Sequence, residues 1–185
     1  MTSRAEWIFG YGSLIWRPAF PFAERRWGFV RGFVRRFWQA SPDHRGTPAV
    51  PGRVATLVPA PRHERCWGVA YQVPAGQLQS VLARLDLREV AGYRRRQVVV
   101  ESGPGRAPLR PALLYTAEPG NPNFVGAAPL QAIAARVARC RGPSGDNAAY
   151  VLRLAEALRR AGVHDPELVV LARLVRGDVG ADQPW

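Results

Sequence analysis

The chain has 185 residues, 47% of them hydrophobic, which is enough to bury a core and excludes a disordered protein. Its formal net charge is +12, from 26 basic and 14 acidic residues, and every one of the basic residues is arginine. Biased codon usage also produces such an arginine-rich chain, so the charge is weak evidence for nucleic-acid binding. A small anionic substrate would also be attracted to such a surface. We expect a single domain over residues 1–185.

Cysteine and histidine are too scattered to predict a metal site or a disulfide framework. Cys66 and Cys140 form no Cys-x-x-Cys pair, and the three histidines lack the spacing that places two imidazoles on one metal. No uncharged run approaches the roughly 20 residues that span a bilayer, and the N-terminus lacks a long apolar segment. The sequence therefore predicts a cytoplasmic protein with no metal and no membrane contact.

A glycine-rich stretch lies near the start of the chain. Apolar residues flank a Gly10-Tyr11-Gly12-Ser13 core within residues 7–16, a pattern typical of a buried strand that runs into a tight loop. Consecutive backbone N–H groups in such a loop can hold an oxyanion, a carboxylate or a phosphate. Taken alone, the same pattern is more often a simple turn between strands.

The next 60 residues read as strands around one long loop. Residues 27–38 interleave arginine with aromatic residues, which predicts a strand with one wet face; the same pattern can also stack bases, although Arg31-Gly32-Phe33 only begins an RNA-recognition octamer. Residues 39–53 form a polar loop punctuated by Pro and Gly, long enough to be a functional cover. Further strands are predicted over residues 54–58 and 67–73.

From residue 75 onward, the sequence predicts a helix, a β hairpin and then further helices. Apolar residues at helical spacing predict a helix over residues 75–87, and a β hairpin follows over residues 93–101 and 109–115. Three amphipathic helices are expected from Pro129 to Gly142, after the capping run 144–147 up to Gly162, and from Asp165 onward. Strands followed by helices, without a parallel βαβ rhythm, indicate the α+β class.

Glu89 is the carboxylate whose position invites a catalytic hypothesis. It follows the helix predicted over 75–87 where the chain turns into a strand, and partial burial there would raise its pKa towards neutrality. From the residues alone, a solvated glutamate paired with Arg88 or Arg94 remains the commoner interpretation.

Taken together in order, eight blocks of this sequence resemble the ChaC family of glutathione-specific γ-glutamylcyclotransferases. The resemblance covers about residues 7 to 175 and rests on residues 9–16, 35–39, 43–46, 51–53, 67–71, 85–89, 92–94 and 142–145. It implies a γ-glutamylcyclotransferase fold, in which a mixed, β-barrel-like sheet is flanked by helices. It also implies an enzyme that cleaves glutathione into 5-oxoproline and Cys-Gly without water, metal or cofactor.

The resemblance also implies roles for particular residues. Glu89 would be the general acid/base, and the loop around Tyr11-Gly12-Ser13-Leu14 would hold the γ-glutamyl group, together with the strand that leads into it (Ile8, Phe9 and Gly10). Arg53 is a further candidate because a guanidinium grips carboxylates bidentately. Tyr150 could reach a substrate carboxylate with its hydroxyl, and Tyr11 could wall the pocket, but either side chain could equally be a core aromatic.

Two features leave questions open. Family members commonly carry a charged residue and a second glycine after the catalytic glutamate, where this chain has Val90-Ala91, so rate and pH optimum are in question. Residues 39–53 could close over the tripeptide, and residues 177–185 have no counterpart in the family. The alternatives are a cyclotransferase for other γ-glutamyl amino acids or amines, and a nucleic-acid-binding module built on the arginine and aromatic strand.

Overall fold

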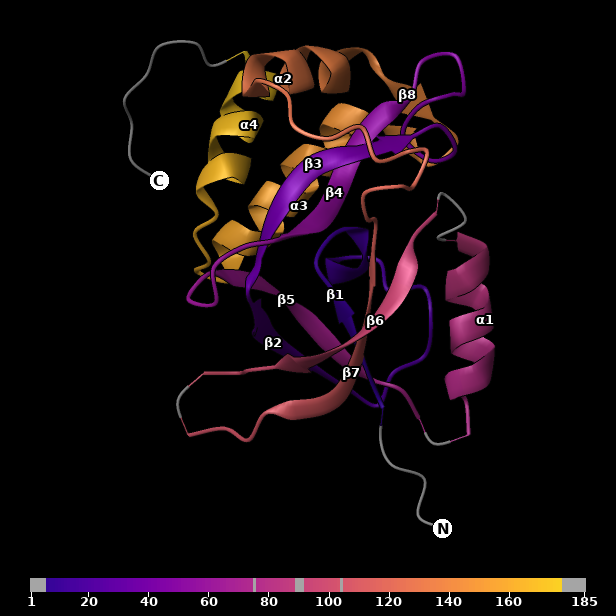
Figure 1. The fold of residues 1–185 in the computed structure, drawn as a ribbon, viewed down its shortest axis with the longest axis vertical. Coiled ribbons are helices and arrows are strands. Elements are labelled where there is room, and N and C mark those ends of the chain that lie inside the picture. The colour runs from indigo at the N-terminus through magenta and orange to yellow at the C-terminus, as the bar shows by residue number, and fades with distance from the viewer. Residues whose placement is uncertain (1–5, 75, 89–91, 104, 178–185) are drawn as a thin grey trace. The chain divides into compact units, whose positions relative to one another are not determined.

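The computed structural model describes residues 6–74, 76–88, 92–103 and 105–177, and Figure 1 shows its course. The chain forms two compact units: unit 1 comprises residues 1–36 and 55–124, and unit 2 comprises residues 37–54 and 125–185. The predicted single domain over residues 1–185 stays a prediction. The Glu89-Val90-Ala91 run and residues 178–185 lie outside the described residues.

Unit 1 is built on a five-stranded mixed sheet with the order β2-β5-β1-β7-β6 (Figure 1). Every neighbouring pair is antiparallel except β1 and β7, which run parallel, with Trp7 opposite Ala112. The strands are β1 (Trp7–Gly10), β2 (Glu24–Arg31), β5 (Arg65–Gln72), β6 (Arg94–Val100) and β7 (Leu109–Thr116). All four residues of β1 are buried, as expected for a strand with a neighbour on each side.

The two outer strands of this sheet meet at a single point. Phe29 of β2 forms an isolated antiparallel bridge with Glu101, directly after β6, with N–H···O distances of 2.8 and 2.9 Å. Gly28 permits this approach, because a Cβ there would lie 2.7 Å from the Glu101 carbonyl oxygen. The sheet is therefore barrel-like, as predicted, although the strands of the described residues form no continuous ladder that closes it.

The strand predicted over residues 27–38 is two strands. β2 ends at Arg31 and β3 (Phe33–Ser41) begins after Gly32, whose φ of +75° is a left-handed conformation that suits glycine. β3 pairs with β4 (Gly52–Pro59) in a separate two-stranded sheet, and the boundary between the units falls within both strands. The single-strand prediction was wrong at Gly32, because the run of strand-forming residues continues on both sides of the turn.

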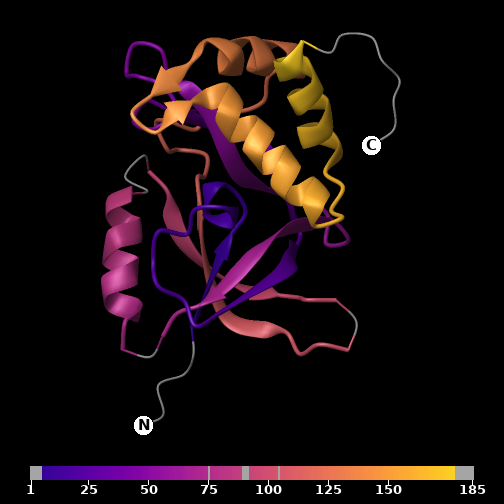
Figure 2. The same cartoon turned by 180° about the vertical axis from the view of Figure 1, so that it is seen from behind.

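The helices are where the apolar spacing predicts them. Unit 1 carries α1 (Leu78–Arg88), which buries Val81, Leu82 and Leu85. Unit 2 carries α2 (Leu130–Arg139), α3 (Asn147–Arg160) and α4 (Pro166–Arg176), seen together in Figure 2, and a short hairpin of β8 (Arg141–Gly142) and β9 (Gly145–Asp146). The core of unit 2 includes fully buried side chains from all three helices, among them Ile133, Leu154, Leu158, Leu168 and Leu171.

The helix ends agree with the predicted caps at α4 and differ at α3. Asp165 caps α4 by accepting a hydrogen bond from the Leu168 N–H at 3.2 Å, and Gly177 ends the helix in a left-handed conformation. Asp146 precedes α3 but makes no side-chain cap hydrogen bond. Asn147, predicted as part of that cap, is instead the first helical residue and is completely buried.

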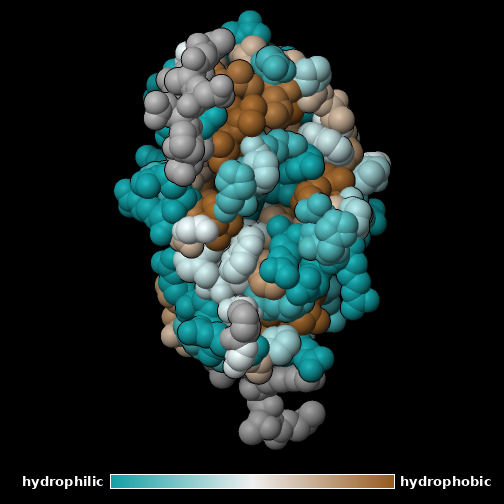
Figure 3. Space-filling model, turned by 90° about the vertical axis from the view of Figure 1, so that its left-hand side faces the viewer, coloured by the Kyte–Doolittle hydropathy of each residue, from teal (hydrophilic) through white to brown (hydrophobic). Residues whose placement is uncertain are grey.

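The side of the molecule shown in Figure 3 carries mostly hydrophilic residues, with separate hydrophobic areas between them. Among the described residues, no helix combines the length and apolar character that crossing a membrane requires.

We predict that Gly68→Ala destabilises the protein by about 1–3 kcal/mol, because the position has no room for a methyl group. A Cβ on Gly68 would lie 2.3 Å from the Gly10 carbonyl oxygen and 2.7 Å from the Phe9 ring. Urea unfolding followed by circular dichroism measures the loss, with Ala83→Ser on the exposed side of α1 as the control. An unchanged unfolding midpoint for Gly68→Ala would show that β1 and β5 can separate freely.

Candidate active site

The glycine-rich stretch folds as predicted, as a buried strand that enters a tight loop. β1 ends at Gly10, and the chain turns through Gly12 into a single 3₁₀ turn, η1 (Ser13–Ile15). The Ile15 N–H donates to the Gly12 carbonyl oxygen at 3.0 Å. The turn is so close that a Cβ on Gly10 would lie 2.4 Å from the Leu14 Cβ. Glycine at position 10 is therefore a steric requirement of this loop.

The open end of this turn carries backbone donors. In a 3₁₀ turn the first N–H groups, here those of Ser13 and Leu14, take no part in the turn's own hydrogen bonds. Amide N–H groups at such a position attract an anion without a charged side chain. Anion binding by this loop stays a prediction.

The predicted binding residues before the loop lie in the core. Ile8 and Phe9 are 0% and 1% exposed, and Tyr11 is 6% exposed. The Tyr11 hydroxyl donates to the Tyr115 carbonyl oxygen at 2.6 Å, which is the core-aromatic alternative for this side chain. A contribution of Ile8 or Phe9 to substrate binding would have to come from the backbone.

Tyr71 anchors the far side of the loop. Its hydroxyl donates to the carbonyl oxygens of Leu14, at 2.7 Å, and Ile15, at 3.2 Å. Burial raises the pKa of Tyr71, although the nearby Arg25 charge acts in the opposite direction. The hydroxyl therefore keeps its proton and remains a donor to the loop.

Tyr115 of β7 connects the loop to the end of α1. Its carbonyl oxygen accepts the hydrogen bond from Tyr11, and its own hydroxyl donates to Asp86 Oδ1 at 2.8 Å. Asp86 also forms an ion pair with Arg95 of β6. One residue thus ties the glycine-rich loop to the last turn of α1.

Glu89, the predicted catalytic residue, lies outside the described residues, but both sides of it are described. It directly follows α1 in the sequence, three residues after Asp86. Three residues after Glu89, Gly92 has a φ of +87° and approaches Asn121 so closely that a Cβ would lie 2.5 Å from its Cγ. In the described residues on either side of it, Asp86 is hydrogen-bonded to Tyr115, and Gly92 lies close to Asn121.

In unit 2, a buried asparagine holds Arg53 by its backbone. Asn147 Oδ1 accepts from the Arg53 N–H at 2.7 Å, and Asn147 Nδ2 donates to the Arg53 carbonyl oxygen at 2.8 Å. Gly52 is fully part of this arrangement, since a Cβ there would lie 2.6 Å from Asn147 Oδ1. Asn147 was predicted only as part of a helix cap; an asparagine at the start of a helix whose following residues form the buried stripe is the signal for this second role.

The Arg53 guanidinium lies against backbone rather than against a carboxylate. Its Nη1 donates to the carbonyl oxygens of Phe37 and Gly126, both at 3.3 Å. Burial lowers the pKa of Arg53, and the positive charge of Arg136 lowers it further. The group stays charged at neutral pH, so an anion beside it would be favoured.

Tyr150 lies on α3 and is 5% exposed. Its ring packs edge-to-face against Phe37, with centroids 6.4 Å apart, and the Arg45 guanidinium lies 5.4 Å from the ring centroid. Phe37 therefore contacts both predicted residues of unit 2, through its ring to Tyr150 and its carbonyl oxygen to Arg53. The core position of the Tyr150 ring was the alternative left open by its helical stripe.

The loop predicted over residues 39–53 is shorter, because β3 continues to Ser41 and β4 starts at Gly52. It is attached to the segment around β8 and β9: the Ser144 N–H donates to the His44 carbonyl oxygen at 3.0 Å, and His44 Nδ1 lies 3.1 Å from Ser144 Oγ. Closure of this loop over a substrate stays a prediction.

Several side chains of the arginine and aromatic stretch, residues 27–38, form ion pairs or are buried in the fold. Arg31 forms two hydrogen bonds with Glu101, at 2.6 and 3.0 Å, and this pairing lowers the pKa of Glu101. Arg35 and Phe37 are 3% and 1% exposed. These two side chains are not offered to a base, whereas Phe33, Arg36 and Trp38 are half-buried.

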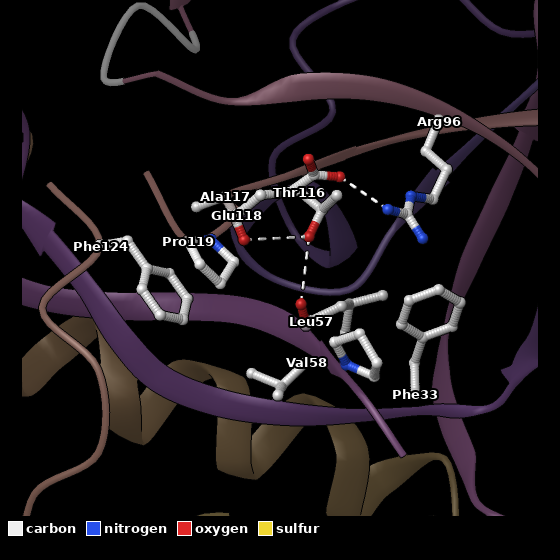
Figure 4. Close-up of a pocket in the computed structure, with 10 residues that line it drawn as sticks. Phe33, Leu57, Val58, Arg96, Thr116, Ala117, Glu118, Pro119 and Phe124 are labelled. Atoms are coloured by element: carbon white, nitrogen blue, oxygen red, sulfur yellow. Dashed lines mark hydrogen bonds and ion pairs between the residues drawn. The ribbon is translucent and has the colours of Figure 1, made fainter. Parts of the chain in front are cut away.

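Figure 4 shows a pocket of unit 1 whose lining residues include none of the glycine-rich loop. It has a volume of about 240 Å³, and Phe33 and Phe124 lie on opposite sides of it. Glu118 at this pocket is paired with Arg96 at 2.7 Å. None of the predicted site residues lines the pocket. Its one lining carboxylate is already engaged, so proton transfer is better assigned elsewhere.

Among the residues that the structure describes, no three His, Cys, Asp or Glu side chains are grouped so that they could hold a metal ion.

The chain is similar to proteins of one family. A family model described as ChaC-like protein matches residues 6–178. The human protein named glutathione-specific gamma-glutamylcyclotransferase 1 is 49% identical over 164 residues, which are 86% of this chain and 72% of that protein. The Schizosaccharomyces pombe protein named glutathione-specific gamma-glutamylcyclotransferase is 38% identical over 178 residues, covering 89% of this chain and 88% of its own length.

A solved structure agrees with the fold. The crystal structure of selenomethionine-labelled γ-glutamyl cyclotransferase specific to glutathione from yeast has a TM-score of 0.86 at 31% identity, covering 94% of this chain and 96% of that one. The family resemblance and the α+β γ-glutamylcyclotransferase fold predicted from the sequence blocks are thereby confirmed.

We predict that Asn147→Ala lowers the free energy of unfolding by about 2–4 kcal/mol, since it leaves the buried N–H and C=O of Arg53 without partners. Chemical unfolding measures this loss. Gln131→Ala removes an amide from the exposed side of α2 and should change stability by less than about 0.5 kcal/mol. Equal stability of the two variants would contradict the structural role of Asn147.

Proposed function

Because the chain belongs to the ChaC-like protein family, we propose that it is a glutathione-specific γ-glutamylcyclotransferase, a lyase that forms a ring. The observation that carries this proposal is similarity along nearly the whole chain to proteins bearing that name in human and yeasts. The backbone N–H groups at the start of the 3₁₀ turn, a kind of group that attracts anions, give it further support. The substrate is then a small anionic peptide, in keeping with the net charge of +12.

The proposed reaction is intramolecular. The α-amine of the γ-glutamyl group attacks the γ-carbonyl carbon, a new C–N bond closes a five-membered ring, and the amide bond to cysteine breaks. The products are 5-oxoproline and Cys-Gly, and no water is consumed. The enzyme must fold the γ-glutamyl arm so that its amine meets its own carbonyl, and such positioning lowers the barrier by removing the search for that geometry.

Glu89 is the proposed general acid/base. One carboxylate can remove a proton from the attacking ammonium and then return a proton to the departing cysteine nitrogen. The resemblance to the family supports this assignment, and Asp86, three residues before Glu89, is held by the Tyr115 hydroxyl at 2.8 Å. The following Val90-Ala91 leaves this glutamate without the charged neighbour common in the family, so its pKa and the pH optimum are expected to differ.

The loop is the proposed grip on the γ-glutamyl group. The backbone N–H groups of Gly12, Ser13 and Leu14 would hold either the α-carboxylate or the oxyanion that develops on the γ-carbonyl. Gly10 allows the turn, Ile8 and Phe9 anchor the strand beneath it, and Tyr11 fixes it to β7.

From unit 2 we propose Arg53 as a partner for a substrate carboxylate and Tyr150 as a second donor to such a group. The support for Arg53 is its desolvated charge, which backbone carbonyls satisfy only in part. Asn147 would act through Arg53 by fixing its backbone. The KM and kcat of an Arg53 variant test the proposed contact with a substrate carboxylate.

We further propose that residues 1–185 form one γ-glutamylcyclotransferase domain, because a single family model extends over both units. A cytoplasmic location is proposed as well, since Cys66 and Cys140 are buried free thiols, as suits a reducing compartment.

We expect the purified protein to convert glutathione to 5-oxoproline and Cys-Gly, and Glu89→Gln to remain folded but lose activity by at least about 100-fold, because general acid/base catalysis is removed. Chromatography of 5-oxoproline measures the rate. Glu118→Gln is the matched control: it makes the same chemical change in a carboxylate paired with Arg96 and should leave turnover within about twofold.

Near-normal turnover by Glu89→Gln would overturn the acid/base assignment while leaving the reaction intact. Faster turnover of γ-glutamyl-alanine than of glutathione would place the enzyme in the alternative cyclotransferase class. An inactive wild-type protein with tight, salt-dependent RNA binding would instead favour the nucleic-acid alternative.

Arg53→Met should raise KM for glutathione about 10- to 100-fold with a smaller change in kcat, because a charge-assisted hydrogen bond to substrate is worth about 1.5–3 kcal/mol. Steady-state kinetics of 5-oxoproline release separates the two parameters. Arg136→Met removes the neighbouring positive charge and serves as the control, with KM expected near the wild-type value. An unchanged KM in Arg53→Met would remove Arg53 from the binding site.

A further inference from the structure

Arg35 of β3 is a buried arginine whose side chain reaches the backbone of the glycine-rich loop. It is 3% exposed, and its Nε donates to the Tyr11 carbonyl oxygen at 2.9 Å. A second guanidinium nitrogen, Nη2, donates to the carbonyl oxygen of Trp67 on β5. The same group therefore bonds to the loop and to the strand beside β1, and all three segments belong to unit 1.

We infer that Arg35 is a positioning residue for the proposed reaction: it sets the Tyr11–Gly12 peptide so that the Gly12 N–H faces the substrate oxygen. This inference rests on the proposed function for its kinetic consequence only. The geometry of the peptide can be tested separately.

The peptide bond between Tyr11 and Gly12 is rigid and planar. In a trans peptide the carbonyl of Tyr11 and the N–H of Gly12 lie in one plane and point in opposite directions. Because Arg35 holds that carbonyl, it aims the Gly12 N–H to the other side of the backbone. Glycine at position 12 restricts its own backbone little, so this peptide needs an external group to fix its orientation.

The group that holds this peptide is the charged guanidinium of Arg35. A hydrogen bond from a guanidinium is stronger than one from a neutral donor, and it polarises the peptide that accepts it. The Gly12 N–H, at the other end of the same peptide, becomes a better donor. Positive charge behind the loop also favours an anion in front of it, so Arg35 acts on the site without touching the substrate.

Arg35 differs in charge from the other side chains that hydrogen-bond to the loop or hold it. Tyr71 holds the carbonyl oxygens of Leu14 and Ile15, and the Tyr11 hydroxyl holds the loop to β7. Those donors are neutral. Arg35 brings a charge to the peptide that leads into Gly12, where an N–H aimed at the developing oxyanion would act on the rate rather than on binding.

The test compares Arg35→Met, Arg35→Lys and the control Arg31→Met. Arginine 31 pairs with Glu101 and is partly exposed, so its loss should leave kcat within about twofold of wild type. All variants are assayed with glutathione well below their measured Tm. Arg35→Met should lose kcat on the order of 100-fold with a much smaller change in KM, as when one oxyanion donor is lost, and Arg35→Lys should lie between Met and wild type.

A second readout reports the peptide itself. Tyr11-Gly12 is the one Tyr-Gly dipeptide in the sequence, so labelling tyrosine with ¹³C at the carbonyl and glycine with ¹⁵N gives a single NMR cross-peak from this bond. That cross-peak should move in Arg35→Met, move less in Arg35→Lys, and stay in place in Arg31→Met. A purely stabilising Arg35 would lower Tm without changing kcat.

Each outcome bears on the inference. A folded Arg35→Met with kcat within about twofold of wild type, or with an unmoved cross-peak, overturns it. If Arg35→Met does not fold, Arg35→Lys and Arg35→Gln replace it under the same criteria. If the wild-type protein releases no 5-oxoproline, the proposed function fails, and the cross-peak alone decides whether Arg35 sets this peptide.

Discussion

Two hydrogen bonds of Tyr115 connect the parts of unit 1 on which the proposed chemistry depends. Its carbonyl oxygen receives the Tyr11 hydroxyl at 2.6 Å, and its own hydroxyl reaches Asp86 at 2.8 Å, near the end of α1. β7, which carries Tyr115, lies parallel to β1 in a fixed register. The glycine-rich loop at the end of β1 and helix α1, which Glu89 follows in the sequence, are therefore both hydrogen-bonded to β7.

In the proposed site, the loop binds the substrate through backbone N–H groups. The surrounding side chains orient that backbone. Gly10 permits the turn by sterics, Tyr71 takes up the carbonyl oxygens of Leu14 and Ile15, and Arg35 takes up that of Tyr11. In the proposed site, backbone N–H groups of the loop are the ones that would bind the ligand. Orienting dipoles before the substrate arrives is the main way in which such a site lowers a reaction barrier.

Two kinds of arginine stand out among the described residues. Several form ion pairs at the surface, such as Arg159 and Arg160 with Glu156, whose pKa they lower to about 2. Pairs of this sort contribute little to stability, because water and salt screen them. Arg35 and Arg53 instead donate to backbone carbonyl oxygens in buried or half-buried places. A desolvated guanidinium is costly to keep, which is consistent with the roles proposed for these two.

The sequence by itself determined the α+β class, the strand-to-loop turn at Gly10 and the helical C-terminal part, because apolar periodicity and glycine are local signals. Its ordered blocks also identified the family and singled out Glu89. Only the tertiary structure decided that Gly32 divides one predicted strand into two, that β2 and Glu101 meet without closing a barrel, and that Asn147, Tyr115 and Arg35 hold the candidate residues in place. These contacts join residues between 24 and 104 positions apart, and no local pattern encodes such a pairing.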